Sequence, residues 1–311
     1  MTRPRLALLV AAAAALSGLT LLGSPAQAAP VQAPQPAARY VALGSSYAAG
    51  GGLGTPDPAG FPGCGRTTMA YPYLVAGALD LDLVNAACGG ATIDNITGTP
   101  QRLQGWDGSI SSVPRQIEAV GSDTGLVTIT IGGNDVNYVG NLMAEACLGD
   151  LVADPASPIS NGLKEYGLCT PRADALVLDQ LAQVEDRLIA MVRAVQAKAP
   201  RARIVLVDYV TVLPPNGKAC AAMPIPQDRQ KFLLEVARTL SLATKHAAQQ
   251  AGVEYVAASK AGAGHDACSA DPWVIGYDFS RGFVIMHPNE AGHAAVADAI
   301  LRQLTGPGRH S

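Results

Sequence analysis

The sequence predicts an α/β fold, a three-layer α/β/α arrangement around a central parallel sheet of about five strands. Short apolar runs typical of buried strands alternate with longer stretches of helical periodicity. Several of these runs end directly in glycine-rich turns, as the carboxyl ends of strands in open α/β sheets often do. The expected strands are Tyr40–Leu43, Leu81–Val84, Leu126–Ile131, Ile204–Val207 and Val253–Val256.

The two longest expected helices are Asp174–Lys198 and Gln227–Gln250. Leu181, Val184 and Leu188 recur at helical spacing in the first of them, which indicates one buried face. Because helices alternate with strands, the connections are expected to cover both faces of a parallel sheet. Three segments rich in glycine, proline and small polar residues are expected to form loops around a substrate cleft: Gly50–Thr68, Gly98–Ser112 and Gly149–Thr170.

The N-terminus has the pattern of a secretory signal peptide. Arg3 and Arg5 precede an apolar run from Leu6 to Leu22, and Ala26-Gln27-Ala28 supplies a small-residue cleavage site. We therefore expect a signal peptide over residues 1–28 and a disordered lead-in over 29–38. One folded domain over 39–306 and a flexible tail over 307–311 follow. The alternative, an uncleaved membrane anchor, is disfavoured because polar and glycine residues interrupt the apolar run.

Composition limits the partners of the exported chain. Loss of Arg3 and Arg5 from the 22 basic residues, against 25 acidic ones, leaves a net charge of −5. Basic patches interleaved with aromatic residues are absent from the sequence, so nucleic acid is not an expected partner. No later run is long and apolar enough to span a bilayer, so we expect no stable membrane anchor. The expectation is a secreted, extracellular monomer.

The six cysteines indicate disulfide bonds. None belongs to a Cys-x-x-Cys pair of the kind that binds zinc, and the chain carries an export pattern. Six cysteines allow 15 connectivities, and the sequence pattern does not choose among them.

Four short motifs, in sequence order, bear the chemistry. They are Gly44-Ser45-Ser46, Asn85-Ala86-Ala87-Cys88-Gly89-Gly90-Ala91, Gly132-Gly133-Asn134-Asp135 and His287-Pro288-Asn289-Glu290-Ala291-Gly292-His293. The first three follow expected strands. They offer a serine together with glycine and asparagine residues, and the fourth offers histidines. A serine can act as a nucleophile only with a base to take its proton and an oxyanion pocket. In order and spacing the motifs resemble the four signature blocks of the SGNH (GDSL-type) hydrolase family, and most of all its secreted actinobacterial lipase and esterase branch.

The resemblance implies a flavodoxin-like SGNH fold and a role for one residue of each motif. Ser46 would be the nucleophile, and its backbone N–H, the Gly90 N–H and the Asn134 side chain would form the oxyanion hole. His287 would be the general base, and neither a metal nor an organic cofactor would be needed. The family pairs neighbouring cysteines, which here implies Cys64–Cys88, Cys147–Cys169 and Cys220–Cys268.

Two positions depart from the family pattern. Ser45 stands where the usual residue is an aspartate that supports the neighbouring loop. Val284 stands three residues before the histidine, where many relatives place the aspartate that orients it. We expect the Val284 backbone carbonyl to orient His287 instead. The nearest carboxylate that could take this role is Asp278, nine residues before the histidine, but it is more simply interpreted as a loop residue.

The expected function is a secreted serine hydrolase that cleaves small-molecule or lipid carboxylic esters through an acyl-enzyme. The alternatives are a carbohydrate acetyl esterase and an impaired SGNH-fold protein that only binds an ester or a glycan. Intact Ser46, Gly90, Asn134 and His287 argue against the impaired protein.

Overall fold

The computed structural model describes residues 38–61, 63–105, 107–282 and 284–306, and these fall in one compact unit. The expected signal peptide, all but the last residue of the lead-in and the C-terminal tail lie outside the described residues. None of the described helices is long and apolar enough to cross a membrane.

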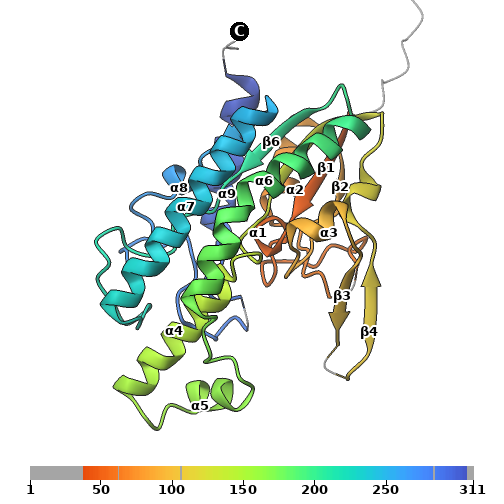
Figure 1. The fold of residues 1–311 in the computed structure, drawn as a ribbon. Coiled ribbons are helices and arrows are strands. Elements are labelled where there is room, and N and C mark those ends of the chain that lie inside the picture. The colour runs from red at the N-terminus through yellow and green to blue at the C-terminus, as the bar shows by residue number, and fades with distance from the viewer. Residues whose placement is uncertain (1–37, 62, 106, 283, 307–311) are drawn as a thin grey trace, which may run out of the picture. The chain divides into compact units, whose positions relative to one another are not determined.

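The central sheet is parallel and has five strands in the order β2-β1-β5-β6-β7 (Figure 1). They are β1 (Arg39–Gly44), β2 (Asp82–Asn85), β5 (Thr124–Thr130), β6 (Arg203–Val207) and β7 (Glu254–Val256). All five expected strands are confirmed, with small shifts at their ends. In the register of the sheet, Gly44 lies opposite Thr130, so β1 and β5 end at the same edge.

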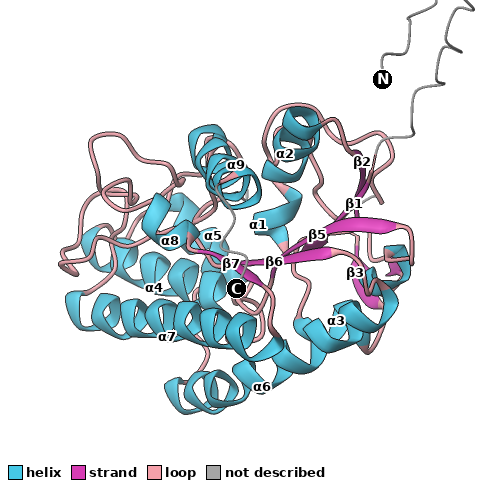
Figure 2. Cartoon of the chain, turned by 90° about the horizontal axis from the view of Figure 1, so that it is seen from above, coloured by secondary structure: helices cyan, strands magenta, loops and turns pink. Residues whose placement is uncertain are grey.

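Helices cover both faces of the sheet, which confirms the three-layer arrangement (Figure 2). One face carries α3 (Ile93–Thr97), α6 (Asp174–Lys198) and α7 (Gln227–Ala251). The other carries α1 (Ser46–Ala49), α2 (Tyr71–Leu79), α8 (Ala258–Ala261) and α9 (Glu290–Thr305). The apolar stripe of α6 is buried as its spacing predicted, with Val184 and Leu188 fully covered.

Two of the three segments expected as loops contain regular structure. Gly98–Ser112 includes β3 (Gln101–Gln104) and most of β4 (Ile110–Val113), which form an antiparallel hairpin outside the central sheet. Gly149–Thr170 includes the end of α4 (Tyr138–Ala153) and all of α5 (Pro158–Glu165). A 3-10 turn, η1 (Gln116–Ala119), precedes β5.

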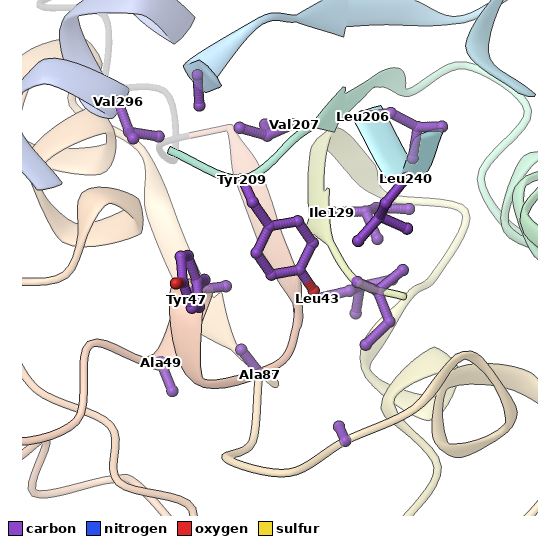
Figure 3. Close-up of a cluster of buried hydrophobic side chains, with 14 of the residues drawn as sticks. Leu43, Tyr47, Ala49, Ala87, Ile129, Leu206, Val207, Tyr209, Leu240 and Val296 are labelled. Atoms are coloured by element: carbon purple, nitrogen blue, oxygen red, sulfur yellow. The ribbon is translucent and has the colours of Figure 1, made fainter. Parts of the chain in front are cut away.

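Side chains between the sheet and its helices form one large apolar cluster. Its part near the carboxyl ends of the strands includes Leu43, Ile129, Leu206 and the two rings of Tyr47 and Tyr209 (Figure 3). The two rings meet edge to face with their centroids 4.7 Å apart. This end of the core thus supports the strand ends where the first three motifs lie.

The structure forms three disulfides, in the neighbour-to-neighbour pairing implied by the family resemblance. Their Cα–Cα distances are 4.2 Å for Cys64–Cys88, 5.4 Å for Cys147–Cys169 and 5.9 Å for Cys220–Cys268. All six cysteines are used. The first bridge ends at Cys88, next to the glycine pair of the second motif.

Candidate active site

Ser46 begins the short helix α1 directly after β1. The turn needs glycine at position 44, where φ is +144° and a Cβ atom would lie 2.4 Å from the Thr130 carbonyl oxygen. The Ser45 N–H donates to that same oxygen at 2.9 Å. The Gln116 side chain completes the turn, since it accepts the Gly44 N–H at 2.7 Å and donates to the Gly44 carbonyl at 2.8 Å. Both backbone groups of Gly44 are therefore satisfied, and Ser46 is held on a fixed frame.

His287 lies on a segment that pairs with residues 273–275. Its carbonyl accepts the Ile275 N–H at 2.8 Å, and the Met286 N–H donates to the Ile275 carbonyl at 2.8 Å. Asn289 then caps α9 by accepting the Gly292 N–H at 3.0 Å. The histidine is thus fixed between an isolated antiparallel bridge and the start of a helix.

Ser46 and His287, 241 residues apart in sequence, meet through a hydrogen bond of 2.7 Å between Oγ and Nε2. On the far side of the ring, Nδ1 lies 2.7 Å from the Ile285 carbonyl oxygen. A carbonyl can only accept, so Nδ1 carries the proton and the Nε2 lone pair faces the serine hydroxyl. This is the protonation arrangement that a general base for Ser46 needs.

The hydrogen-bond acceptor for Nδ1 differs by one residue from the expected one. We predicted the Val284 carbonyl, but the hydrogen bond goes to Ile285, and the Val284 carbonyl adds only a weaker interaction that also raises the pKa of His287. The Val284 side chain packs over Gly52, so closely that a Cβ atom added at Gly52 would lie 2.2 Å from Cγ1 of Val284. The tight turn just before the histidine, with Met286 at a φ of +61°, brings the nearer carbonyl back to the ring.

Tyr47 links the serine turn to the histidine segment. Its buried hydroxyl donates a hydrogen bond to the Met286 carbonyl, and its ring centroid lies 5.0 Å from that of His287. Met286 adopts left-handed backbone, which is unusual for a residue with a long side chain and has to be held by its surroundings. Tyr47 supplies such a contact from the residue next to Ser46.

Burial sets the charge state of the histidine. Desolvation lowers the pKa of His287 below its usual value of about 6.5, and the carbonyls of Ile285 and Val284 oppose this only in part. The imidazole is therefore neutral at neutral pH and free to accept a proton.

The Gly89-Gly90 turn lies beside the serine turn, because the Cys88 N–H donates to the Gly44 carbonyl at 3.0 Å. Gly90 has a φ of +76°, a backbone conformation that favours glycine. Within the described part of the chain, the Gly90 N–H and the Ser46 N–H have no hydrogen-bond acceptor. Both are available to bind an oxyanion.

Asn134 is held close to this turn. Its side-chain Nδ2 donates to the Ala91 carbonyl at 2.9 Å, which leaves its second N–H for a ligand. The preceding Gly133 N–H donates to the Tyr209 hydroxyl at 2.8 Å, and a Cβ at Gly133 would lie 2.8 Å from that hydroxyl. The second glycine of this motif is thus required by the close approach of Tyr209.

Asp135, the last residue of the same motif, ties it to α6 and to the start of α3. Its buried carboxylate forms a 2.7 Å ion pair with Arg187 of α6 and accepts the Ile93 N–H at 3.1 Å. Burial raises the pKa of Asp135 even though Arg187 favours the charged form. By helical spacing alone, Glu185, Asp186 and Arg187 would be interpreted as a solvated face of α6, and only the fold shows that Arg187 pairs with Asp135.

The four motifs therefore meet at one edge of the sheet. Direct hydrogen bonds join the first to the second, the second to the third and the first to the fourth. The arrangement offers an activated hydroxyl, a neutral base and three N–H donors. Among the described residues, no group of three or more His, Cys, Asp or Glu side chains could hold a metal ion.

Comparison with known proteins identifies the family. The sequence profile of the GDSL-like Lipase/Acylhydrolase family matches residues 42–295, which include all four motifs. The chain belongs to this family. Lipase 2 of Streptomyces coelicolor is 32% identical over 309 residues, covering 97% of this chain and 98% of that protein.

Two solved structures of Streptomyces enzymes have a similar fold. Phospholipase A1 from Streptomyces albidoflavus NA297 has a TM-score of 0.64 at 25% identity, over 86% of this chain and 99% of that one. An extracellular lipase from Streptomyces rimosus has a TM-score of 0.63 at 24% identity, over 86% of this chain and 100% of that one. Family membership makes the protein a carboxylic ester hydrolase of the lipase and esterase type.

Two further positions singled out in the sequence, Ser45 and Asp278, lie outside the hydrogen bond between Ser46 and His287. Ser45 is buried, and its Oγ lies 3.4 Å from the Tyr209 hydroxyl. Asp278, the alternative partner for His287, accepts the N–H and hydroxyl of Ser280 at 2.9 and 3.0 Å and makes no hydrogen bond to the histidine. Its environment is that of a loop carboxylate.

Proposed function

We propose that the protein hydrolyses carboxylic esters through an acyl-enzyme on Ser46, with His287 as the general base. The main support for this proposal is the 2.7 Å hydrogen bond between Ser46 Oγ and His287 Nε2, together with the hydrogen bond that Nδ1 donates to the Ile285 carbonyl. A serine whose hydroxyl points at the lone pair of a neutral imidazole is poised to lose its proton as it attacks.

In the first half-reaction, Oγ of Ser46 attacks the acyl carbon while its proton passes to Nε2 of His287. The carbonyl oxygen becomes an oxyanion, which accepts hydrogen bonds from the Ser46 N–H, the Gly90 N–H and Nδ2 of Asn134. The bond to the alcohol oxygen then breaks, and the alcohol leaves with the proton from Nε2.

In the second half-reaction, His287 takes a proton from water as the water oxygen attacks the acyl-enzyme. The same three donors stabilise the second oxyanion, and the ester bond to Ser46 breaks as its oxygen regains the proton. The products are one carboxylic acid and one alcohol for each ester and water consumed. Each donor is expected to contribute about 100- to 1000-fold in rate.

The test compares two neighbouring serines. Ser46→Ala should abolish both ester hydrolysis and labelling by a fluorophosphonate, whereas Ser45→Ala should retain measurable activity and labelling. Circular dichroism and the melting temperature show whether both variants are folded. Equal loss in two folded variants would disprove the assignment, and an unlabelled, inactive parent protein would favour a protein that only binds its ligand.

A chain-length series defines the substrate. Hydrolysis of p-nitrophenyl esters from acetate to palmitate, together with a phospholipid and an acetylated xylan, separates a lipase or phospholipase from a soluble esterase and from a carbohydrate acetyl esterase. The relatives named as lipases support a preference for lipid esters.

We also propose that the protein is exported and acts as a monomer. The N-terminal pattern and the three disulfides support export. Protein recovered from the culture medium should begin at Ala29 and elute at a monomer's size in light scattering. An N-terminus still at Met1 would rule out cleavage.

A further inference from the structure

The peptide unit between Gly89 and Gly90 determines the direction of one proposed oxyanion donor. Its carbonyl belongs to Gly89 and its N–H to Gly90, and both lie in one plane and point in opposite directions. Whatever fixes the Gly89 carbonyl therefore also fixes the Gly90 N–H. The Gln101 side chain makes this contact, because its Nε2 donates to the Gly89 carbonyl at 2.7 Å.

This peptide unit needs such a contact more than most. Glycine on both sides removes the steric barriers that restrict rotation of a peptide plane, and Gly90 already has a positive φ of +76°. A rotated plane would turn the Gly89 carbonyl, a partial negative charge, toward the oxyanion. The neighbouring bonds, from the Gly89 N–H to the Cys64 carbonyl and from the Ala91 N–H to the Cys88 carbonyl, hold the adjoining peptides but not this one.

The position of Gln101 is fixed by strand pairing and burial. It is the first residue of β3, it pairs with Val113 of β4, and only 7% of its surface is exposed. The hairpin that carries it stands apart from the central sheet, next to α3 (Figure 1). Only the NH₂ group of an amide can donate to a carbonyl, so the orientation of the side chain follows from its partner.

One polar atom of the Gln101 side chain is left without a partner in the part of the chain that the structure describes. Its Oε1 is buried and has no hydrogen-bond partner among the described residues. A buried polar atom without a partner is unfavourable, and an apolar side chain of the same length would avoid the penalty. A residue kept for packing alone would not need an amide at this position.

We propose that Gln101 is a positioning residue of the oxyanion hole, which aims the Gly90 N–H by holding the Gly89 carbonyl. The proposal rests on the proposed role of Gly90 as an oxyanion donor. A hydrogen bond accepted by the carbonyl also polarises the amide and makes its N–H a better donor. Gln101 does not touch the reacting atoms.

The test replaces the amide by an apolar side chain of similar size. Gln101→Met should lower kcat on a soluble ester about 10-fold, a part of the roughly 100- to 1000-fold that a whole donor contributes, and should leave KM within twofold. The melting temperature should change little, because removal of the orphaned Oε1 offsets the loss of the hydrogen bond to the Gly89 carbonyl. Gln101→Leu serves the same purpose should the methionine variant fail to fold, and Gln104→Met, at an exposed position of the same strand, should change kcat by less than twofold.

Matched ester and thionoester substrates separate positioning from a general structural effect. Sulfur accepts hydrogen bonds more weakly than oxygen, so a weaker oxyanion hole should reduce the ester-to-thionoester rate ratio in the Gln101 variants. A kcat within twofold of the parent, or a fall in kcat with an unchanged ratio, would overturn the proposal. Failure of the underlying mechanism would look different, because Ser46→Ala would then remain active.

Discussion

The buried histidine of the last helix should make the protein sensitive to mild acid. His293 is 1% exposed, and its Nδ1 accepts the N–H of Tyr71 at 3.2 Å, the first residue of α2. It thus satisfies one of the unpaired N–H groups at the start of that helix. Desolvation is the main cause that lowers the pKa of His293 to about 3, and the nearby His287 contributes to the same shift.

The direction in which pH changes the unfolding free energy follows from whether the folded or the unfolded state binds the His293 proton more tightly. Because the folded state binds this proton more weakly than the unfolded state, His293 favours folding above pH 6.5, and the benefit is lost as pH falls from 6.5 toward 3. With pKa values of about 6.5 and about 3, moving from pH 7.5 to pH 5 should cost about 2 kcal/mol of unfolding free energy. Most carboxylates titrate below this range, so the histidine contribution can be separated from theirs.

The assay is urea unfolding at pH 7.5, 6.5, 5.5 and 5.0. His293→Gln keeps an acceptor for the Tyr71 N–H but cannot titrate, so its stability should fall about 2 kcal/mol less than that of the parent over this range. His246→Gln, which removes an exposed histidine of α7, should retain the steep dependence of the parent. Parallel pH profiles for the parent and His293→Gln would refute the reasoning.

Four shorter predictions concern the site and the disulfides. The acid limb of kcat/KM against pH should have a pKa below 6.5, because burial lowers the pKa of His287 and keeps the base neutral in weak acid; a limb above 6.5 would contradict this. Tyr47→Phe should lower kcat/KM about 10-fold, since the Met286 carbonyl loses its hydrogen bond, with a small change in melting temperature. Asp278→Asn should change kcat/KM by less than about 10-fold, about 1.4 kcal/mol, whereas a loss near 10⁴-fold would make Asp278 the partner of the histidine. Thiol titration of the folded protein should find no free cysteine, and reduction should lower the melting temperature by many degrees, since loops of 22, 24 and 48 residues each stabilise by about 3–4 kcal/mol.

The strands could be predicted because strands buried on both faces are nearly continuous apolar runs. The β3–β4 hairpin could not, since Gln101-Arg102-Leu103-Gln104 has no such run and lies outside the main sheet. Helix α5 was also missed, because Pro158 and Gly162 lie within an eight-residue segment. Proline is nevertheless tolerated in the first turn of a helix, where its missing N–H is not needed.

Within the site, the motif residues, including Gly90 with its backbone N–H, could be located from the sequence, and their catalytic roles stay predictions. The carbonyl that orients the histidine could not be predicted correctly. Ser46, His287 and Asn134 lie at strand or helix ends within motifs that are visible in the sequence. Every residue has a carbonyl, however, so choosing Ile285 over Val284 requires the local backbone path. Gln101 acts in the same way on a backbone carbonyl, and nothing in its sequence context indicates that contact.

The two departures from the family pattern affect different parts of the proposed mechanism. At Ser45, the Tyr209 hydroxyl lies 3.4 Å from Oγ and accepts the Gly133 N–H, so a neutral tyrosine lies between the serine turn and the asparagine turn. At the histidine, the Ile285 carbonyl selects the same tautomer as a carboxylate would but brings no full negative charge. The large loss seen when a triad aspartate is neutralised arises from the wrong tautomer, which this arrangement avoids. What remains is weaker stabilisation of the imidazolium, and in the proposed mechanism this places more of the catalytic demand on the three proposed oxyanion donors and on Gln101, which is proposed to aim one of them.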